Sequence, residues 1–546
     1  MPAKVLTSRQ TTGARAPRFR TIIPLALAAA FTGQCLWFID TQSLTYDEGP
    51  HIIAGLDAWH HGRFELWNDQ PPLGRLLLTA PIAFRSERWT LDNEGPSGAN
   101  FWTIAIRPDP TRLAWQTRPV NVAIGLALMW LLWITTRRLL SEPAANVALA
   151  LFACSPALIA HFSLATVDGI AVFFLFATAA AVDRWRRTPS WPATCGLGFV
   201  LAGLLLTKYS APPLVALALV IMLVVSDEPR ARFAKAGAAL AIALTAVWAA
   251  FLFHLGPVTF RSGSLDGPYG RSGTVIVPLS HPFDRTIRLP APEYIAALGG
   301  VAQHAVRGQP SFLLGEVRRS GGWTRYFPSV VLLKWPPTMW MMCGAAIAGL
   351  VVRRRRVPGG LVMMMLFPLV FFGLAMSTRL NVGDRYVLPV YPFLLLLGAT
   401  LYETARSSRV GVATVAALIA IQAVDAARYA PDYLSYMTPV VAPERAYQWL
   451  SDSNIDWGQG LIALRDYQRA HPDQRLSLAY FGGVDPRSYG IGAHSFGEEE
   501  RVHGTVVVSA THLSGQYLQN PTAYHWLLDY PRTTMLNHSL HVFEVP

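Results

Sequence analysis

Charged residues are scarce in this sequence, at 15% of its 546 residues, whereas hydrophobic residues make up 52%. In an ordinary globular domain about a quarter of the residues are charged, so the composition excludes a soluble enzyme. The apolar residues recur in long blocks, which also excludes a disordered chain and a coiled coil. Cysteine is scarce as well: the four cysteines fall inside apolar blocks, without paired or CxxC spacing. This excludes a disulfide scaffold and a thiolate metal site.

Acidic residues are outnumbered, because 46 lysines and arginines stand against 34 aspartates and glutamates, giving a formal net charge of +12. In a soluble protein such an excess would suggest a nucleic-acid partner. Here the basic residues lie between the apolar blocks, which is the pattern of a membrane topology. We therefore expect membrane lipids, and no nucleic acid, among the partners.

Apolar blocks dominate the part of the sequence from 22 to 426. A bilayer-spanning helix needs roughly 20 mainly apolar residues, and about 11 blocks approach this length. They lie at 22–39, 119–136, 144–163, 167–182, 192–207, 211–226, 236–254, 327–351, 359–376, 386–404 and 410–426. The sequence therefore predicts an α-helical polytopic membrane protein.

Basic connections between these blocks predict the orientation. Every second connection is rich in arginine or lysine: Arg137, Arg138, Arg184, Arg186, Arg187, Arg230, Arg232, Lys235, Arg353 to Arg356, Arg406 and Arg409. The positive-inside rule places these connections in the cytoplasm, together with a basic tail at 1–21. An odd number of spans then places the C-terminus outside. A cleaved signal peptide at the first block is the alternative, but it would leave an even number of spans.

Three segments on the predicted external side are too long to be mere connections: 40–118, 255–326 and 427–546. The first keeps several tryptophans among its charges, as expected of helices that lie along the membrane interface. The last contains the candidate strands RLSLAYFGG, GTVVVSATHL and SLHVFEV. Because these alternate with helix-like stretches, we expect a small external α/β domain over 427–546.

Acidic residues mark a candidate site on the external side. Asp47 and Glu48 follow the first span closely in TYDEGP, and adjacent carboxylates can act as a general base and as an orienting or metal-binding partner. A solvated acid pair is the simpler interpretation of these two residues alone. Asp168 favours a site, because it lies at the outer end of a span, where a charge must be paired or functional.

Basic partners follow the same geometry: Arg118, Lys208 and Arg385 each stand at the predicted outer end of a span. Each one alone can be explained as a side chain that snorkels to the interface. Together with the acids they outline an external cavity that suits an anionic lipid head group whose tail stays in the bilayer.

The order of these motifs resembles the GT-C polyprenyl-phosphate glycosyltransferases of glycosyltransferase family 39, the group with the protein O-mannosyltransferases and the lipid A aminoarabinose transferases. Asp47-Glu48 is similar to the family's first acidic motif, PPLGR to its Pro-Pro-Leu segment, LATVDG to its second acidic motif and LTKYSA to its lysine-containing turn. Arg118 stands where the family has an arginine that opens its second span. GDRYVLPVYPF and DSNIDWGQGL are typical of bacterial members.

This resemblance implies a GT-C membrane glycosyltransferase in a bacterial inner membrane, with a periplasmic active site. A sugar on polyprenyl phosphate would pass to a hydroxyl of a glycolipid, lipid A, a polysaccharide or a protein, with inversion. In this interpretation Asp47 is the base, Glu48 orients the site, Asp168 is the second acid, and Arg118, Lys208 and Arg385 hold the donor phosphate. Whether the reaction needs a divalent cation, Mg²⁺ or Mn²⁺, stays open; Glu48 and Asp168 would be its ligands.

Two departures from the named families limit the assignment. Gln70 precedes the Pro-Pro pair, where mannosyltransferases tend to have histidine and aminoarabinose transferases lysine, so neither specificity can be transferred. The loop 255–326 is too short for a MIR-type β-trefoil. Gln70 itself, Arg75 of PPLGR and His161, which precedes the second acidic motif, are further candidates for the site.

Two other functions remain as alternatives at this stage. A polytopic transporter or lipid flippase would have charged residues at the membrane midplane and broken helices, whereas here the ionisable residues gather at one face. A non-catalytic assembly subunit is the other alternative. A nucleotide-sugar donor is disfavoured, because the sequence has no glycine-rich phosphate loop.

The segment DSNIDWGQG in the predicted external domain allows two interpretations. Asp452 and Asp456 beside Trp457 can bind a carbohydrate by hydrogen bonding and stacking. The favoured interpretation is structural, with Asn454 and Asp456 capping a helix that begins near Leu461.

Overall fold

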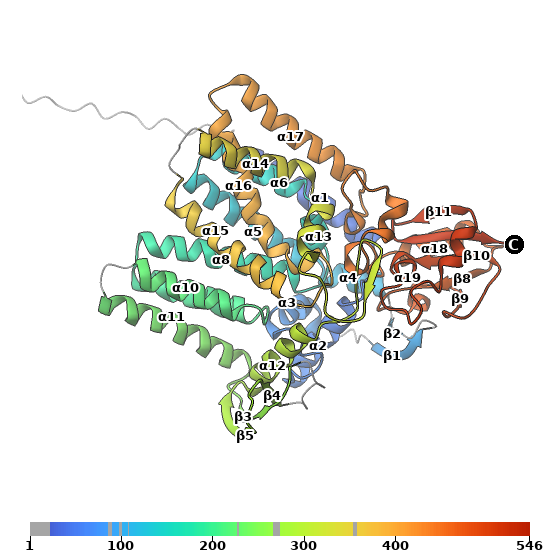
Figure 1. The fold of residues 1–546 in the computed structure, drawn as a ribbon, viewed down its shortest axis with the longest axis horizontal. Helices are drawn as coiled ribbons and strands as arrows, with labels where there is room; N and C mark the ends of the chain where they lie inside the picture. The colour runs from blue at the N-terminus through green and yellow to red at the C-terminus, as the bar shows by residue number, and fades with distance from the viewer. Residues whose placement is uncertain are drawn as a thin grey trace, which may run out of the picture.

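A computed structural model describes residues 22–85, 90–97, 101–107, 109–225, 229–265, 273–352 and 357–546. The predicted basic tail at 1–21 and the arginines at 353–356 lie outside these residues. Figure 1 shows a bundle of long helices with a smaller domain of strands and helices at one end. We call this end of the bundle the domain end.

Each of the predicted apolar blocks falls on helix. The helices of the bundle are α1 (Ile22–Thr41), α4 (Pro110–Thr117), α5 (Pro119–Leu139), α6 (Glu142–Ala153), α7 (Pro156–Phe162), α8 (Asp168–Arg187), α9 (Trp191–Leu205), α10 (Pro212–Val225), α11 (Pro229–Ala250), α13 (Tyr326–Lys334), α14 (Pro337–Val352), α15 (Gly359–Ser377), α16 (Tyr391–Ala405) and α17 (Arg409–Ala427). Their apolar side chains form one large core with the aromatic residues of the connections. The predicted class, an α-helical polytopic membrane protein, is confirmed.

Two of the helical blocks are bent. The axes of α6 and α7 meet at 68°, and those of α13 and α14 at 107°. Both breaks precede a proline, Pro156 or Pro337, and proline disfavours a helical residue before it. Within the described ranges, six helices are long and apolar enough to cross a membrane, or eight if each bent pair is one span. The number of about 11 spans stays a prediction, because α9 and α10 have only 15 and 14 residues.

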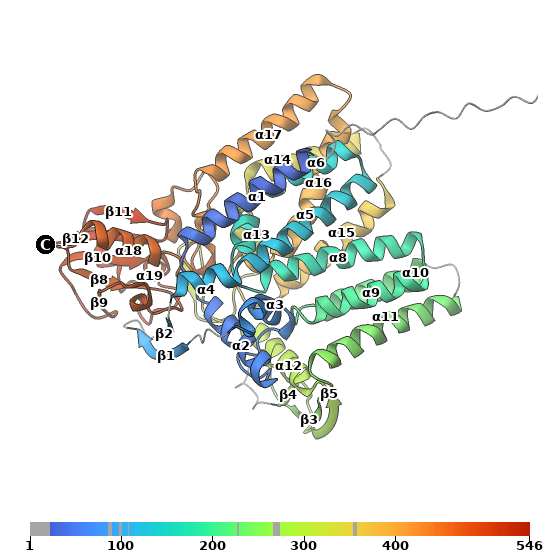
Figure 2. The same cartoon turned by 180° about the vertical axis from the view of Figure 1, so that it is seen from behind.

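Short connections at the end opposite the domain are built from serine caps and arginines. Ser141, Ser190 and Ser408 accept backbone hydrogen bonds at the starts of α6, α9 and α17. Such caps satisfy N–H groups that the first helical turn leaves unpaired. Asp183, which is fully buried, binds Arg138 at 2.5 Å and further arginines of its own helix. The described connections from α5 to α6, α8 to α9 and α16 to α17, which carry these caps, therefore lie at one end of the bundle, as Figures 1 and 2 show.

This asymmetry makes a testable prediction about topology. If the arginine-rich end is cytoplasmic, alkaline phosphatase fused after Pro546 will be active in cells, and the same enzyme fused after Arg406 will be inactive, because the phosphatase folds only outside the cytoplasm. Western blots of both fusions control for expression. The opposite pattern of activity would contradict an external site at the domain end.

Smaller elements cover the domain end. Between α1 and α4 lie α2 (Glu48–His61), α3 (Pro72–Ala83), and the antiparallel strands β1 (Thr90–Ser97) and β2 (Phe101–Arg107). Between α11 and α13 lie β3 (Leu255–Ser262), β4 (Thr274–Val277), β5 (Asp284–Pro290), α12 (Pro292–Arg307), β6 (Ser311–Leu313) and β7 (Glu316–Arg318). The helices expected in the first external segment are therefore present.

The C-terminal domain contains a five-stranded mixed sheet, with the strand order β11-β12-β10-β8-β9. Its elements are α18 (Leu461–Ala470), β8 (Leu476–Ala479), β9 (His494–Ser495), β10 (Gly504–Ser509), α19 (Ala510–Ser514), β11 (Arg532–Leu536) and β12 (Leu540–Val545). The three strands expected from the sequence are β8, β10 and β12. β10 is parallel to β8 and antiparallel to β12, so this α/β arrangement agrees with the prediction.

Backbone hydrogen bonds join the C-terminal domain to the segment that follows α1. The N–H of Ser43 donates to the carbonyl of Gln459 at 3.0 Å, and that of Tyr46 to the carbonyl of Trp457 at 2.9 Å. Gly483 lies so close to Tyr46 that a Cβ on the glycine would be 2.4 Å from the Tyr46 carbonyl oxygen. The residue before Asp47 is therefore fixed by the C-terminal domain.

Candidate active site

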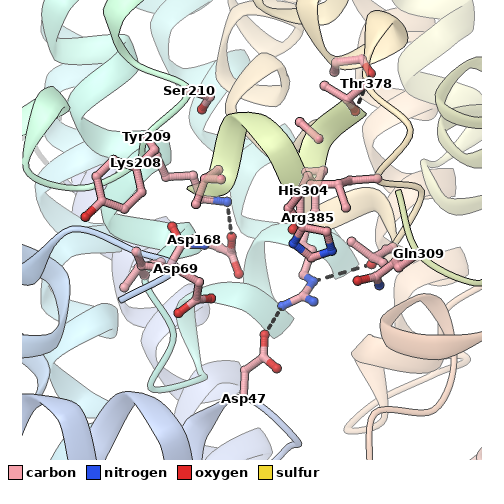
Figure 3. A pocket seen from close by; sticks show the side chains of 18 of the residues that line it. Asp47, Asp69, Asp168, Lys208, Tyr209, Ser210, His304, Gln309, Thr378 and Arg385 are labelled. Carbon is pink, nitrogen blue, oxygen red and sulfur yellow. Dashed lines mark hydrogen bonds and ion pairs between the residues drawn. The ribbon is translucent and has the colours of Figure 1, made fainter. Parts of the chain in front are cut away.

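A cavity of about 670 Å³ opens at the domain end of the bundle. Asp47, Asp168, Lys208 and Arg385 line it together, although they come from four separate parts of the chain. Figure 3 shows their side chains directed toward one another. The structure thus brings together four of the six acids and cations that the sequence assigned to the site.

Asp47 and Arg385 form the first ion pair of the cavity. Asp47 immediately precedes α2 but makes no side-chain cap, and its Oδ2 lies 2.5 Å from Nη1 of Arg385. The guanidinium also covers the ring of Trp457, with its Cζ 4.1 Å from the ring centre. Burial lowers the pKa of Arg385, but the charges of Asp47 and Asp168 outweigh burial and raise it. A permanent cation therefore stands beside the Asp47 carboxylate.

Asp168 and Lys208 form the second ion pair. Asp168 is the first residue of α8, and Lys208 lies in the turn between α9 and α10. The Lys208 ammonium donates to Oδ1 of Asp168 at 2.6 Å and lies 5.1 Å from the ring centre of Tyr386. Because its side chain is 13% exposed, Lys208 keeps access to the cavity for further hydrogen bonds.

Glu48 and Arg118 form a third pair, which lies outside the cavity. Both side chains are fully buried. Nε and Nη2 of Arg118 donate to the two carboxylate oxygens of Glu48 at 2.8 Å, and its other N–H groups reach the carbonyls of Gln42 and Ser43. Glu48 also accepts the N–H of Ala165 at 2.7 Å. This pair therefore fixes the segments that carry Asp47 and Asp168, and Arg118 has no donor directed at a ligand in the cavity.

The remaining candidates from the sequence occupy different positions. Gln70 lines the cavity. Arg75 is buried beneath it and donates to Asp69 at 2.6 Å and to Nδ1 of His51 at 3.3 Å. Burial, followed by the charge of Arg75, lowers the pKa of His51. His161 is buried behind the site, with its Nε2 3.6 Å from Oδ1 of Asp384, and does not line the cavity.

The segment DSNIDWGQG forms part of the wall that the C-terminal domain contributes. Asp452 and Trp457 line the cavity. Asp456 is buried away from it, and burial raises its pKa to about 7 although the N–H groups of Thr511 and Gly458 donate to it. The expected helix cap is wrong, because Gly460 precedes α18 and no side chain caps it.

One side of the cavity is apolar. Leu298 and Val301 of α12, Phe371 and Leu374 of α15, and Pro213 of α10 line it. Apolar helices that line a cavity beside the bilayer can accept a hydrocarbon chain. The cavity therefore offers charge on one side and an apolar surface on the other, as an amphiphilic ligand requires.

The expected cation ligands do not fit a metal ion here. Glu48 lies outside the cavity with both oxygens bonded to Arg118, while Asp168 binds Lys208. In the part of the chain that the structure describes, no group of three His, Cys, Asp or Glu side chains could hold a metal ion. The mechanism proposed below therefore uses only the side chains of this protein.

One known protein family matches part of the chain. Residues 110–254 match the family model described as dolichyl-phosphate-mannose-protein mannosyltransferase. This segment is therefore similar to a family of GT-C glycosyltransferases. It includes both members of the Asp168–Lys208 pair and Arg118 of the buried pair, but neither member of the Asp47–Arg385 pair. No curated protein matches the sequence.

Several solved structures are similar over much of the chain. ArnT from Cupriavidus metallidurans bound to undecaprenyl phosphate is 13% identical over 95% of this chain and 97% of that chain, with a TM-score of 0.44. The Archaeoglobus fulgidus oligosaccharyltransferase is 12% identical over 83% and 62% of the two chains, with a TM-score of 0.40. The S. cerevisiae Pmt1-Pmt2 complex bound to the sugar donor is 17% identical over 44% and 34%, with a TM-score of 0.32.

Sequence reasoning missed cavity residues that carry no motif of their own. Tyr46, Phe481 and Tyr517 line the cavity, and their rings form a parallel stack with centroids 5.6 and 5.5 Å apart. Tyr46 was visible as the neighbour of Asp47. The other two lie in the C-terminal domain, where Phe481 belongs to a stretch interpreted only as a strand and Tyr517 to no motif.

Proposed function

We propose that this GT-C protein transfers a sugar from a polyprenyl-phosphate donor to an acceptor hydroxyl at the domain end of the bundle. The observation that carries this proposal is the convergence of Asp47, Asp168, Lys208 and Arg385 in a cavity with one apolar side. The match of residues 110–254 to a dolichyl-phosphate-dependent family supports it. The charged groups gather at one end of the bundle, which favours transfer over transport through the midplane.

The donor phosphate is placed between Lys208 and Arg385. A phosphodiester accepts charge-assisted hydrogen bonds from both cations, and a guanidinium has five N–H donors, so Arg385 can hold a phosphate while it keeps Asp47. The polyprenyl chain then lies along α12 and α15 at the apolar side. In this position the same two cations stabilise the charge that develops on the leaving phosphate.

Asp47 accepts the proton of the acceptor hydroxyl. The acceptor oxygen bonds to the anomeric carbon as the bond from that carbon to the phosphate oxygen breaks, and the electron pair leaves with the polyprenyl phosphate. A single displacement of this kind inverts the anomeric configuration. Proton acceptance by a positioned carboxylate typically contributes about 10²–10⁴-fold, so electrostatic stabilisation of the leaving phosphate must supply much of the remainder.

The identity of the sugar and of the acceptor depends on the residues that line the cavity. One of these, Gln70, differs from the residue that the named families tend to have at this position. We propose the periplasmic side of a bacterial inner membrane, with glycolipid, lipid A, polysaccharide or protein as acceptor. Mass spectrometry of lipid A, glycolipids and envelope proteins from a deletion strain and its parent tests this. A sugar missing from one of these classes in the deletion strain would identify the acceptor, and identical profiles would contradict the proposal.

Lys208→Ala and Arg385→Ala are expected to weaken donor binding. Each removes a charge-assisted hydrogen bond to the phosphate, which is worth about 1.5–3 kcal/mol, so the Kd for undecaprenyl phosphate should rise roughly tenfold or more. Titration of the purified variants in detergent measures this change.

Arg261→Ala is the matched control for these two variants. Arg261 forms an exposed ion pair with Asp284 at 3.0 Å, and neither residue lines the cavity; such a pair contributes little to stability. We expect its affinity to equal that of the unaltered protein. Unchanged affinity in Lys208→Ala and Arg385→Ala alike would refute the phosphate site.

A further inference from the structure

The loop that contains Asp452 is clamped to the helical bundle. Oγ of Ser453 donates to the carbonyl of Val382 at 2.5 Å, and Asn454 accepts the N–H of Asp384 at 3.1 Å. The buried ammonium of Lys334 donates to the carbonyl of Asn454 as well. These contacts fix the loop next to η2 (Asp384–Tyr386), the element that carries Arg385.

Asp452 itself has an uncommon backbone conformation. Its φ is +58°, and non-glycine residues in this region are few, with Asp and Asn the most tolerant. The N–H of Asp452 donates to Oγ1 of Thr511 at 3.1 Å, which holds this conformation. Residues held in this way cluster at functional sites, and the result here is a carboxylate in the cavity wall.

Each carboxylate oxygen of Asp452 has one partner within the domain. Oδ1 accepts the N–H of Ser453 at 2.6 Å, and Oδ2 accepts the hydroxyl of Tyr517. An ionised carboxylate has about four lone-pair sites, so both oxygens can accept one more hydrogen bond. Burial raises the pKa of Asp452, while the charge of Arg385 opposes this rise.

We propose that Asp452, oriented by Tyr517, binds hydroxyl groups of a saccharide in the cavity, so that the C-terminal domain completes the binding site. The inference rests on the proposed function and names a subsite for it. Trp457, Tyr46 and Tyr517 add aromatic rings to the lining of the same cavity, and the hydroxyl of Tyr517 donates to the carboxylate. A carboxylate can accept hydrogen bonds from the hydroxyl groups of a sugar, and aromatic rings can pack against the apolar C–H edges of the sugar ring.

The position beside Arg385 favours the sugar of the donor. Arg385 covers Trp457 at 4.1 Å, and Trp457 belongs to the same loop as Asp452. A sugar attached to a phosphate that Arg385 holds therefore faces this loop. A saccharide acceptor that approaches Asp47 would offer the same hydroxyl chemistry, so the experiment has to distinguish these two sources.

The test compares Asp452→Asn and Tyr517→Phe with the unaltered protein. The ligands are undecaprenyl phosphate and its mannosyl, glucosyl, galactosyl and aminoarabinosyl derivatives, and the variants are titrated with the sugar lipid that the unaltered protein binds most tightly. Asn tolerates the backbone at φ +58° and keeps the shape of the side chain. Asp473→Asn, an exposed change in the same domain, is the control. Thermal unfolding of each variant shows that it is folded.

A donor-sugar site predicts that Asp452→Asn loses about tenfold to a hundredfold in affinity for the sugar-bearing lipid and keeps its affinity for undecaprenyl phosphate. Tyr517→Phe should lose about two- to tenfold. If donor affinity is unchanged and the KM of a saccharide acceptor rises instead, the acceptor is the ligand.

Equal affinity of folded Asp452→Asn and unaltered protein for both lipids, with an unchanged acceptor KM, would overturn the inference. A second result would also overturn it: the unaltered protein binds none of the mannosyl, glucosyl, galactosyl and aminoarabinosyl lipids more tightly than undecaprenyl phosphate, and its acceptor is not a saccharide. The proposed function fails on a different result, the absence of binding to undecaprenyl phosphate itself.

Discussion

Asp47→Asn is expected to abolish sugar transfer while the protein stays folded and binds its lipid donor. Asparagine keeps the shape of the side chain and can still accept a hydrogen bond from Arg385, but it cannot take a proton at neutral pH. Loss of the base alone should lower kcat by about 10²–10⁴-fold. Steady-state kinetics of the reconstituted variant, together with a donor titration, would separate this loss from a loss of binding.

Asp40→Asn is the matched control for the base, because Asp40 is exposed at the end of α1 and does not line the cavity. Its turnover should be normal. Near-normal turnover by Asp47→Asn would remove the base from the mechanism and make Asp168 the next candidate.

Arg118→Ala is expected to destabilise the fold strongly. The change leaves the fully buried carboxylate of Glu48 without its partner, and removing one member of a buried ion pair typically costs about 3–5 kcal/mol. It also breaks the hydrogen bonds to the carbonyls of Gln42 and Ser43. Thermal unfolding in detergent should show a large decrease in Tm, which the exposed control Arg261→Ala should not show.

The double variant Glu48→Gln with Arg118→Met separates a structural pair from a phosphate site. No charge is then left unpaired, so the double variant should recover part of the stability that Arg118→Ala loses. If Arg118 instead held the donor phosphate, as the sequence suggested, Arg118→Ala would have a normal Tm and a weakened affinity for the donor. That outcome would contradict the structural role of the pair.

The fold was predictable where one physical signal dominates. Apolar blocks require burial or lipid, so their helices could be predicted from composition, and three strand-like stretches located β8, β10 and β12. The bends before Pro156 and Pro337 were not predicted, because the sequence alone showed 144–163 and 327–351 each as one continuous apolar block. β9, with two residues, is too short to show a pattern.

The charged residues of the site were predictable from the sequence, but the ion pairs that they form were not. Topology placed Asp47, Asp168, Lys208 and Arg385 on one face, and the structure joins them in one cavity. Glu48 and Arg118 met the same criteria, yet they lie 70 residues apart in sequence and bind each other in the interior. Whether two opposite charges face a ligand or each other depends on how the start of α2 meets the junction of α4 and α5, which spacing does not reveal.

The central claim is that the cavity cleaves a lipid-linked sugar. The most direct measurement is the release of undecaprenyl phosphate from undecaprenyl-phosphate-linked sugars by the purified protein in proteoliposomes, with envelope glycolipids or proteins supplied as acceptors. We predict that undecaprenyl phosphate appears together with one glycosylated acceptor, and that Asp47→Asn produces neither. Movement of intact donor between the two leaflets, without its cleavage, would contradict the transferase and indicate a lipid transporter.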